Sequence, residues 1–479
     1  MIAHKRIMSS ANQSAAKSPF VHRKLRAFFA SITLIVIVAL GIRIAFTWNY
    51  VNEHPHQALS VIPFMFESGN IAVSVAKGNG FVSPFRVSTG PTAWMTPVYP
   101  ALLAAVFRIF GIYTLNSYLA ATSLNIVFAS LACIPIFFAG KRISGTGLGA
   151  GAAWLWALFP NAILLTFQSM WEACLSALLA AIILWATLAL IETSRVRDWI
   201  GYGLLWGLTL MTNPTLASVL PFLLIWLAYR LHKQRQPWLA LPAIALCVAI
   251  LCCIPWTIRN YSVFHRFVPL RSVLGLQLWL GNNPQAQPPW LGNLHPINDE
   301  AERQSYIEMG EMNYMRFKKR EAIRYIKAHP AREAWLAGER FISIWSGGTS
   351  HPFSDFATND SLWFRYVLLF NLAIAVGALL GIILLCFRLS IYAFPLAVFP
   401  IVFPCAYYAT LALPRYSLPM DPIVILLTAI ALGGIFRPWK FLKRSRREQE
   451  GNAAEKIEQR QSLFSPSNAA TLYASAKVG

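Results

Sequence analysis

The stretch LWFRYVLLFNLAIAVGALLGIILLC, residues 362–386, indicates the fold class most directly. Its only charged residue is Arg365, which lies near the start of the stretch. A helix needs about 20 consecutive, mostly apolar residues to cross the hydrocarbon core of a bilayer. This stretch therefore predicts a membrane-spanning helix.

Similar apolar runs recur along most of the chain, so the same argument applies to the whole protein. Of the 479 residues, 56% are hydrophobic and only 13% are charged, about half the charged share of a soluble domain. We predict an all-α, polytopic membrane bundle of about ten transmembrane helices. The predicted spans are residues 27–48, 116–140, 147–168, 172–191, 199–212, 213–230, 238–258, 362–386, 391–412 and 417–436.

The net charge of +21 is distributed in short basic clusters between the apolar runs. This distribution is typical of membrane topology signals, and we expect no nucleic-acid partner. The apolar segment Pro97–Gly111 is short and contains Arg108. If it lies flat at the outer interface, the later basic clusters fall on the same side as the basic N-terminus. The positive-inside rule then predicts an inner (plasma) membrane protein with both termini in the cytoplasm.

The chain divides into three predicted parts. Residues 1–26 form a basic cytoplasmic segment, residues 27–436 the transmembrane domain, and residues 437–479 a basic, partly disordered cytoplasmic tail. Two large loops of the transmembrane domain, at about 49–115 and 259–361, are expected outside. In the second loop, residues 299–340 carry charges at helical spacing. Asp299 is suited to begin a helix there, and Pro330 to interrupt the pattern.

Glu67 is the first candidate catalytic residue. It lies in FMFESGN, within a short helix predicted from Pro63 to Lys77 and closed by Gly78-Asn79-Gly80. A carboxylate beside Phe66 would lie near a low-dielectric surface, which raises its pKa and suits a general base. The alternative is an ordinary solvated glutamate in a loop.

Glu172 is the second candidate, at the start of the predicted span 172–191. An ionisable group at the end of a membrane helix suggests a functional role. A charge that merely favours the helix dipole is an equally good explanation.

Basic residues at the outer ends of two spans are candidates for binding a lipid phosphate, because guanidinium groups pair with phosphate oxygens. Single arginines that extend to the lipid interface are the alternative explanation. We expect Asp421 to pair with Arg415. The candidates are Arg259, His265, Arg266 and Arg271, after the span 238–258, and Arg415, before the span 417–436.

No nucleotide-binding loop, dinucleotide fingerprint or zinc motif is present, so bound ATP is not expected as the energy source. No cofactor is required by the sequence. Two outer carboxylates could share a divalent metal, although no spacing demands one.

The order of several segments resembles the bacterial GT-C glycosyltransferases of the ArnT/protein O-mannosyltransferase-like superfamily, family 39. The resembling segments are Glu67 with Gly78-Asn79-Gly80-Phe81, GPTAWMTPVYPALLAAVFRIFG (90–111), Trp171-Glu172, GLTLMTNP (207–214), PWTIRNYSVFHRFVPLRS (255–272), LWLGNNP (278–284) and PRYSLPMDP (414–422). Together they span most of the chain from about 60 to 436.

The resemblance implies a cell-envelope enzyme that takes a hexose or pentose from a polyprenyl-phosphate sugar. The acceptor would be a lipid, a glycan or a protein outside the cytoplasm, and membrane lipids would be further partners. Glu67 matches the family's catalytic base and Glu172 its second acidic residue. The sugar would be transferred with inversion, and the basic cluster would stabilise the leaving phosphate.

Two other classes remain open from the sequence. A flippase for lipid-linked sugars, or another secondary transporter, would require polar groups deep in several spans and related halves, neither of which is evident. A membrane scaffold without chemistry is the third hypothesis. The sugar, the acceptor, the polyprenyl length, metal dependence and the oligomeric state are not determined by the sequence.

Overall fold

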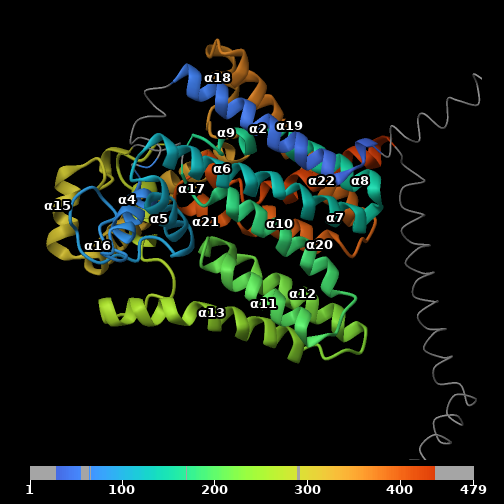
Figure 1. The fold of residues 1–479 in the computed structure, drawn as a ribbon, viewed down its shortest axis with the longest axis horizontal. Helices are drawn as coiled ribbons and strands as arrows, with labels where there is room; N and C mark the ends of the chain where they lie inside the picture. Colours follow the sequence, from blue (N-terminus) through green and yellow to red (C-terminus); the bar gives the residue numbers. More distant parts are fainter. Residues whose placement is uncertain (1–27, 55–63, 65, 169, 288–291, 437–479) are drawn as a thin grey trace, which may run out of the picture.

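The computed structural model describes residues 28–54, 64, 66–168, 170–287 and 292–436. Within these residues the chain is helical, and its only β pairing is an isolated bridge between Val82 and Pro91. The predicted all-helical membrane fold is confirmed (Figure 1). The terminal segments 1–26 and 437–479 fall outside the described residues.

Six helices of the described chain are long and apolar enough to cross a membrane. They are α2 (Ile32–Glu53), α6 with α7 (Leu115–Ser144), α10 (Ala173–Leu190), η2 with α12 (Pro214–Lys233), α13 (Ala240–Phe264) and α19 (Leu362–Phe387). The other predicted spans are shorter helices or broken pairs. They are α8 (Thr146–Ala157) with α9 (Pro160–Leu164), α11 (Val196–Leu210), α20 (Ala393–Val402) with α21 (Cys405–Ala409), and α22 (Asp421–Phe436).

Prolines cause several of these breaks. Pro160 begins α9 directly after α8 has ended, and Pro214 begins the 3₁₀ helix η2 (Pro214–Ser218) after α11. Proline has no backbone N–H and clashes with the preceding turn, so it is tolerated at the first helical position but not in the interior of a regular helix. A 3₁₀ turn that begins at Pro214 thus follows α11.

The segment Pro97–Gly111 forms the helix α5 (Val98–Phe110). Its 13 residues extend about 20 Å, which is less than the roughly 30 Å of a bilayer core. Arg108 donates to the carbonyl oxygens of Val75 and Ala76, at the end of α4 (Glu67–Ala76). The segment is thus attached to the first loop helix, as expected of a helix that does not span.

The second large loop is also helical. It contains α14 (Leu274–Gly281), η3 (Gly292–Leu294), α15 (Glu300–Met309), α16 (Glu311–Ala328), α17 (Pro330–Ser346) and α18 (Pro352–Thr358). Asp299 caps α15 by accepting a hydrogen bond from the Glu302 N–H at 2.9 Å. Pro330 begins α17, so both predicted helix signals are confirmed. Figure 1 shows α4, α5, α15 and α16 gathered at one end of the bundle.

Arg43 connects the first span to the bundle. Its side chain is fully buried on α2 and donates to the carbonyls of Ala157 and Trp156, at the end of α8. A cation at a helix C-terminus interacts favourably with the helix dipole and with carbonyls that have no partner in the helix. Arg43 thus holds α2 against the break between α8 and α9.

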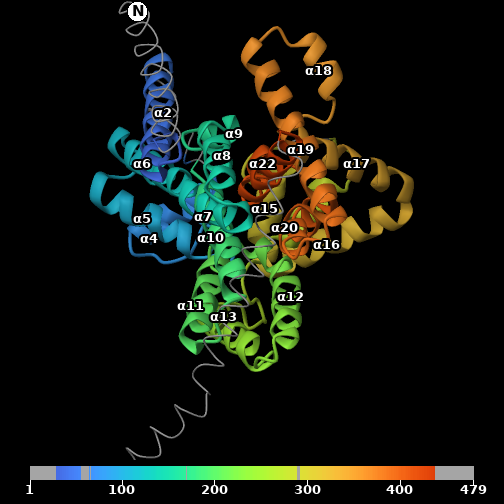
Figure 2. The same ribbon diagram turned by 90° about the vertical axis from the view of Figure 1, so that its right-hand side faces the viewer.

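Glycines allow two helix pairs to approach closely. A Cβ added to Gly381 of α19 would lie 2.2 Å from the carbonyl oxygen of Leu427 in α22. In the group formed by α11, α12 and α13 (Figure 2), a Cβ on Gly207 of α11 would lie 2.4 Å from Cβ of Cys252 in α13. Small residues at helix interfaces let backbones pack closely in lipid, where hydrophobic burial does not drive association.

We predict that Gly381→Ala lowers the free energy of unfolding by about 1–3 kcal/mol, because the added methyl group forces α19 away from α22. Thermal unfolding of the purified protein in detergent measures the change. The matched control is Gly41→Ala, because a Cβ at Gly41 meets no atom within 4 Å. Equal melting temperatures of the two variants would contradict the close-packing argument.

Candidate functional site

A cavity of about 410 Å³ lies where the loop helices meet the membrane bundle. Its walls come from the start of α4, residues 94–95, the start of α10, η2, residues 271–280, residues 295–297 and residues 406–419. Most of the wall is apolar, with Leu276, Leu280 and Leu411 among its members. Charged groups enter it from several elements, and they decide what chemistry the cavity can perform.

Glu67 lies at the first position of α4 and lines the cavity with only 5% of its surface exposed. Its Oε1 lies 3.0 Å from Nε2 of His295. Burial alone would raise the pKa of Glu67, but the pKa is lowered below its ordinary value, chiefly by the hydrogen bond from His295, with a backbone N–H and the charge of Arg415 acting in the same direction. The expectation of a raised pKa is therefore wrong, because Glu67 is not an isolated carboxylate.

Glu172 precedes α10 and is 8% exposed. Its Oε1 accepts a hydrogen bond from Nη2 of Arg271 at 2.7 Å, while its Oε2 has no partner among the described residues. Both side chains line the cavity. The second carboxylate oxygen of Glu172 therefore stays available to a ligand.

Arg415 lines the same cavity from the 3₁₀ helix η4 (Pro414–Tyr416). Its guanidinium carbon lies 4.2 Å from the ring centre of Trp171 and 5.1 Å from that of Tyr416. Aromatic rings hold a guanidinium by cation–π attraction without occupying its N–H groups. The predicted pairing with Asp421 is wrong: Oδ2 of Asp421 accepts from the Ser417 hydroxyl at 3.2 Å instead.

The fold thus brings four of the seven predicted site residues into one cavity, namely Glu67, Glu172, Arg271 and Arg415. Arg259, His265 and Arg266 are not part of its lining. His265 is exposed and ends α13 in the left-handed conformation, at φ 51°. Arg266 donates to Oδ1 of Asn313 on α16, at 3.1 Å.

Arg259 fixes the loop that carries the cavity residues Trp94 and Met95. Its guanidinium donates to the carbonyls of Phe81 at 2.7 Å and Thr92 at 2.8 Å, and it lies 5.0 Å from the Trp256 ring centre. The N–H groups of Arg259 therefore bind backbone carbonyls of the protein. The role that the structure supports for Arg259 is positional.

Glu311 also holds the loop that precedes Trp94, through Thr92 and Ala93. Its carboxylate accepts hydrogen bonds from the Thr92 hydroxyl, the Ala93 N–H at 2.8 Å, the Ser272 hydroxyl at 2.6 Å and the Tyr306 hydroxyl at 2.6 Å. Burial raises the pKa of Glu311, and the three side-chain hydroxyls and the N–H oppose that rise. Glu311 therefore fastens α16 to the loop and to the residue next to Arg271.

Sequence reasoning missed Glu311 and His295. Glu311 is one of several acidic residues in the charged stretch 299–340, and nothing in the sequence distinguishes it from the exposed ones. His295 lies in a polar loop segment, LGNLHPIND, with no motif around it. Only the folded positions of the two residues separate them from surface groups.

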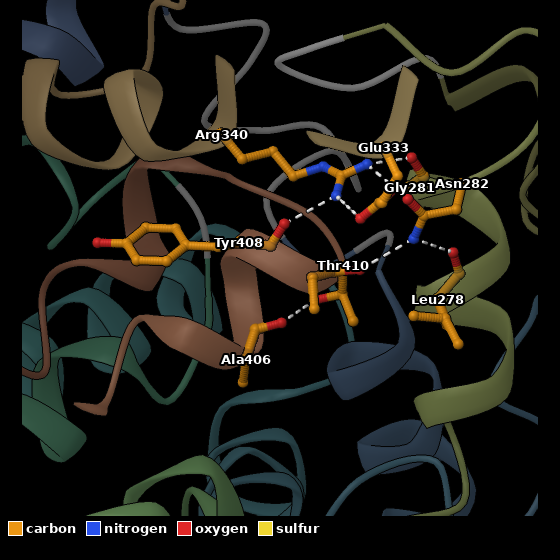
Figure 3. A network of polar contacts seen from close by, with 9 residues as sticks. Leu278, Gly281, Asn282, Glu333, Arg340, Ala406, Tyr408 and Thr410 are labelled. Carbon is orange, nitrogen blue, oxygen red and sulfur yellow. Dashed lines mark hydrogen bonds and ion pairs between the residues drawn. The ribbon is translucent and has the colours of Figure 1, made fainter. Parts of the chain in front are cut away.

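Another buried network, centred on Arg340, connects two elements that lie beside the cavity (Figure 3). Arg340 of α17 donates to the Gly281 carbonyl, to Oδ1 of Asn282 at 3.0 Å and to the Tyr408 carbonyl at 2.8 Å. It also pairs with Glu333 at 3.3 Å. The network ties the end of α14 to α21, two elements whose neighbouring residues line the cavity.

The described residues do not favour a bound metal ion. The part of the chain that the structure describes has no group of three His, Cys, Asp or Glu side chains able to hold an ion. One oxygen of each cavity carboxylate is already paired, with Arg271 on Glu172 and His295 on Glu67.

Comparison with known proteins shows what the chain is similar to. Residues 94–258 match the family described as dolichyl-phosphate-mannose-protein mannosyltransferase. The oligosaccharyltransferase AglB of Archaeoglobus fulgidus, solved with an inhibitory peptide and a dolichol-phosphate, superposes with a TM-score of 0.54 at 14% identity, over 87% of this chain and 51% of AglB. Part of the chain thus matches a mannosyltransferase family, and its fold is similar to that of a GT-C glycosyltransferase. The predicted resemblance is confirmed.

A second structure of the archaeal enzyme has a similar fold. The apo form of the Archaeoglobus fulgidus oligosaccharyltransferase gives a TM-score of 0.53 at 13% identity, over 87% of this chain and 51% of that one. ArnT from Cupriavidus metallidurans, bound to undecaprenyl phosphate, gives 0.35 at 14% identity, over 84% and 77%. The chain spans about half the length of the archaeal enzymes. No curated protein matches it by sequence.

We predict that Arg259→Gln lowers the free energy of unfolding by about 2 kcal/mol, because the backbone carbonyls of Phe81 and Thr92 lose a charged hydrogen-bond donor. Thermal unfolding in detergent checks this. Arg266→Gln is the control, since Arg266 contacts one exposed side chain of α16 rather than the loop. If the Arg259 and Arg266 variants had the same melting temperature, the loop would not depend on the hydrogen bonds from Arg259.

Proposed function

We propose that the protein is a glycosyltransferase that moves a sugar from a polyprenyl-phosphate donor to an extracytoplasmic acceptor. The observation that carries the proposal is the convergence of two buried carboxylates and two guanidinium groups on one cavity, from segments far apart in the sequence. The family match to residues 94–258 and the GT-C fold support it. No observation on the described residues favours a transporter or a scaffold.

The proposed reaction is a single displacement with inversion. The acceptor oxygen attacks the anomeric carbon, the bond from that carbon to the phosphate oxygen breaks, and polyprenyl phosphate leaves with the bonding electrons. Glu67 is ionised at neutral pH because its pKa is lowered, so it accepts a hydrogen bond from the acceptor and then its proton. The cavity wall holds both reactants in line.

The guanidinium groups stabilise the phosphate that leaves. Negative charge develops on the phosphate as the sugar leaves, and positive groups already in place stabilise it without reorganisation. Arg271 and Arg415 are the two that reach the cavity. Glu172 orients Arg271, and its partnerless Oε2 is free to accept a hydrogen bond from a hydroxyl of the sugar or the acceptor.

Two comparisons support the proposed donor class. The matching family is described by a dolichyl-phosphate sugar donor, and the AglB structure contains a dolichol-phosphate and a peptide. A polyprenyl-phosphate hexose or pentose is the corresponding donor for this chain. The acceptor would be a lipid, a glycan or a protein, and lipid and glycan mass spectrometry with and without the protein would identify both the acceptor and the sugar.

The proposed location is the inner (plasma) membrane. The transmembrane domain covers residues 27–436, with both termini in the cytoplasm and the loops 49–115 and 259–361 outside. The cavity would then face outward, because Glu67, Arg271 and His295 belong to these two loops and Glu172 and Arg415 adjoin the outer ends of spans.

We predict that Glu67→Gln lowers the transfer rate by about 10²- to 10⁴-fold, because the amide cannot accept the proton of the acceptor. Transfer is measured with purified protein and radiolabelled polyprenyl-phosphate mannose, chosen from the family description. Glu53→Gln is the control, an exposed glutamate at the end of α2. Wild-type turnover by a folded Glu67→Gln protein would refute the assignment.

We predict that Arg415→Gln weakens the binding of sugar-free undecaprenyl phosphate by about tenfold, which is about 1.4 kcal/mol, since the phosphate loses one cationic partner. Titration followed by native mass spectrometry measures the dissociation constant. The control is Arg365→Gln, because Arg365 bonds to the Phe356 carbonyl and does not line the cavity. An unchanged dissociation constant in both variants would remove Arg415 from the phosphate site.

A further inference from the structure

We propose that His295 is a positioning residue that acts as a neutral hydrogen-bond donor to Glu67 and does not itself take the proton in the reaction. This inference deepens the proposed function and rests on it for the identity of the base. It concerns the protonation state of the pair, which the geometry around the imidazole ring determines.

The two ring nitrogens have different partners. Nδ1 of His295 accepts a hydrogen bond from the backbone N–H of Ile297 at 3.1 Å. A nitrogen that accepts a hydrogen bond carries no proton, so in the neutral ring the proton is on Nε2. Nε2 is the atom that faces Oε1 of Glu67, at 3.0 Å.

Protonation of Nδ1 would bring its proton against the N–H of Ile297. The hydrogen bond to the backbone would be lost, and the donor of Ile297 would face another donor. The next residue after His295 is Pro296, whose fixed φ limits how far the loop can turn to relieve this contact. The backbone thus selects the tautomer that donates to Glu67.

Aromatic rings fix the plane of the imidazole. The ring centre of His295 lies 5.6 Å from that of Trp94 and 6.1 Å from that of Phe85, and both contacts are edge-to-face. The side chain is 9% exposed. A ring held on two sides cannot flip to exchange its nitrogens without displacing its neighbours.

Other charged and titratable groups face Glu67 across the cavity. Arg415 and Tyr416 approach from η4, Glu172 from the start of α10, and Arg271 from the segment before α14. Arg415 also lowers the pKa of Glu67, but less than His295 does. His295 is therefore the main neighbour that keeps the buried carboxylate ionised.

The pair divides the work of a general base. Both nitrogens of His295 are engaged, so it has no lone pair for the proton of the acceptor. That proton passes to Glu67, whose carboxylate is held in one orientation by the imidazole N–H. After the sugar has moved, the proton leaves Glu67 for water and the pair returns to its first state.

The first test compares two substitutions by their pH profiles of transfer from polyprenyl-phosphate mannose. His295→Ala removes the donor, so the pKa of Glu67 rises and the acidic limb moves up by about one pH unit. His295→Gln can still accept from Ile297 and donate to Glu67, so its profile should match the wild type. His351→Gln is the control, a histidine 3.7 Å from Glu339 outside the cavity.

Two results would overturn the inference. An unshifted profile in His295→Ala would show that the imidazole does not set the ionisation of Glu67. Equal loss of activity at every pH in folded His295→Ala and His295→Gln would show that the histidine takes the proton itself. If Glu67→Gln were fully active, the proposed function would fail instead, and the protonation state would be decided by the second test.

The second test needs no activity. Nitrogen NMR of protein labelled with [¹⁵N]histidine reports which ring nitrogen carries the proton, and the His295→Gln spectrum assigns the signal. The expected state at pH 7 is the neutral ring with the proton on Nε2. A proton on Nδ1, or a charged ring at pH 7, would contradict the inference.

Discussion

Burial of two carboxylates in a mostly apolar cavity is the constraint on which the site depends. A buried charge without a partner is costly, so each carboxylate must have one. His295 meets this need for Glu67, and Arg271 meets it for Glu172. Each partner comes from the second loop, whereas Glu67 and Glu172 come from earlier in the chain. The two pairs therefore join parts of the molecule that no secondary structure connects.

Further polar groups hold the walls around these pairs. Glu311 and Arg259 both bind the segment before Trp94 and Met95, and Arg340 ties α14 to α21. Together these side chains satisfy backbone groups of that segment and of the ends of α14 and α21. Irregular backbone near a membrane needs such partners, because its N–H and C=O groups cannot remain unpaired in a low-dielectric surrounding. The functional loops are thus kept in place by buried charges of their own.

The helices were predictable, and the site only partly so. Apolar runs, prolines and Asp299 indicated the elements because each signal acts within a few neighbouring residues. Glu67 and Glu172 could be selected because they are rare acidic residues beside apolar segments. His295 and Glu311 could not, because their roles depend on partners far away in the sequence.

The sequence alone determined that this is a helical membrane protein, which segments are apolar helices, and which family it resembles. Those properties follow from local hydrophobicity and helix signals, which act over one or two turns. Only the tertiary structure decided which charges share the cavity, that Arg259 holds a loop, and that Glu67 has a lowered pKa. The reason is physical: charges interact through space at a few ångströms, and the folded packing alone sets those distances.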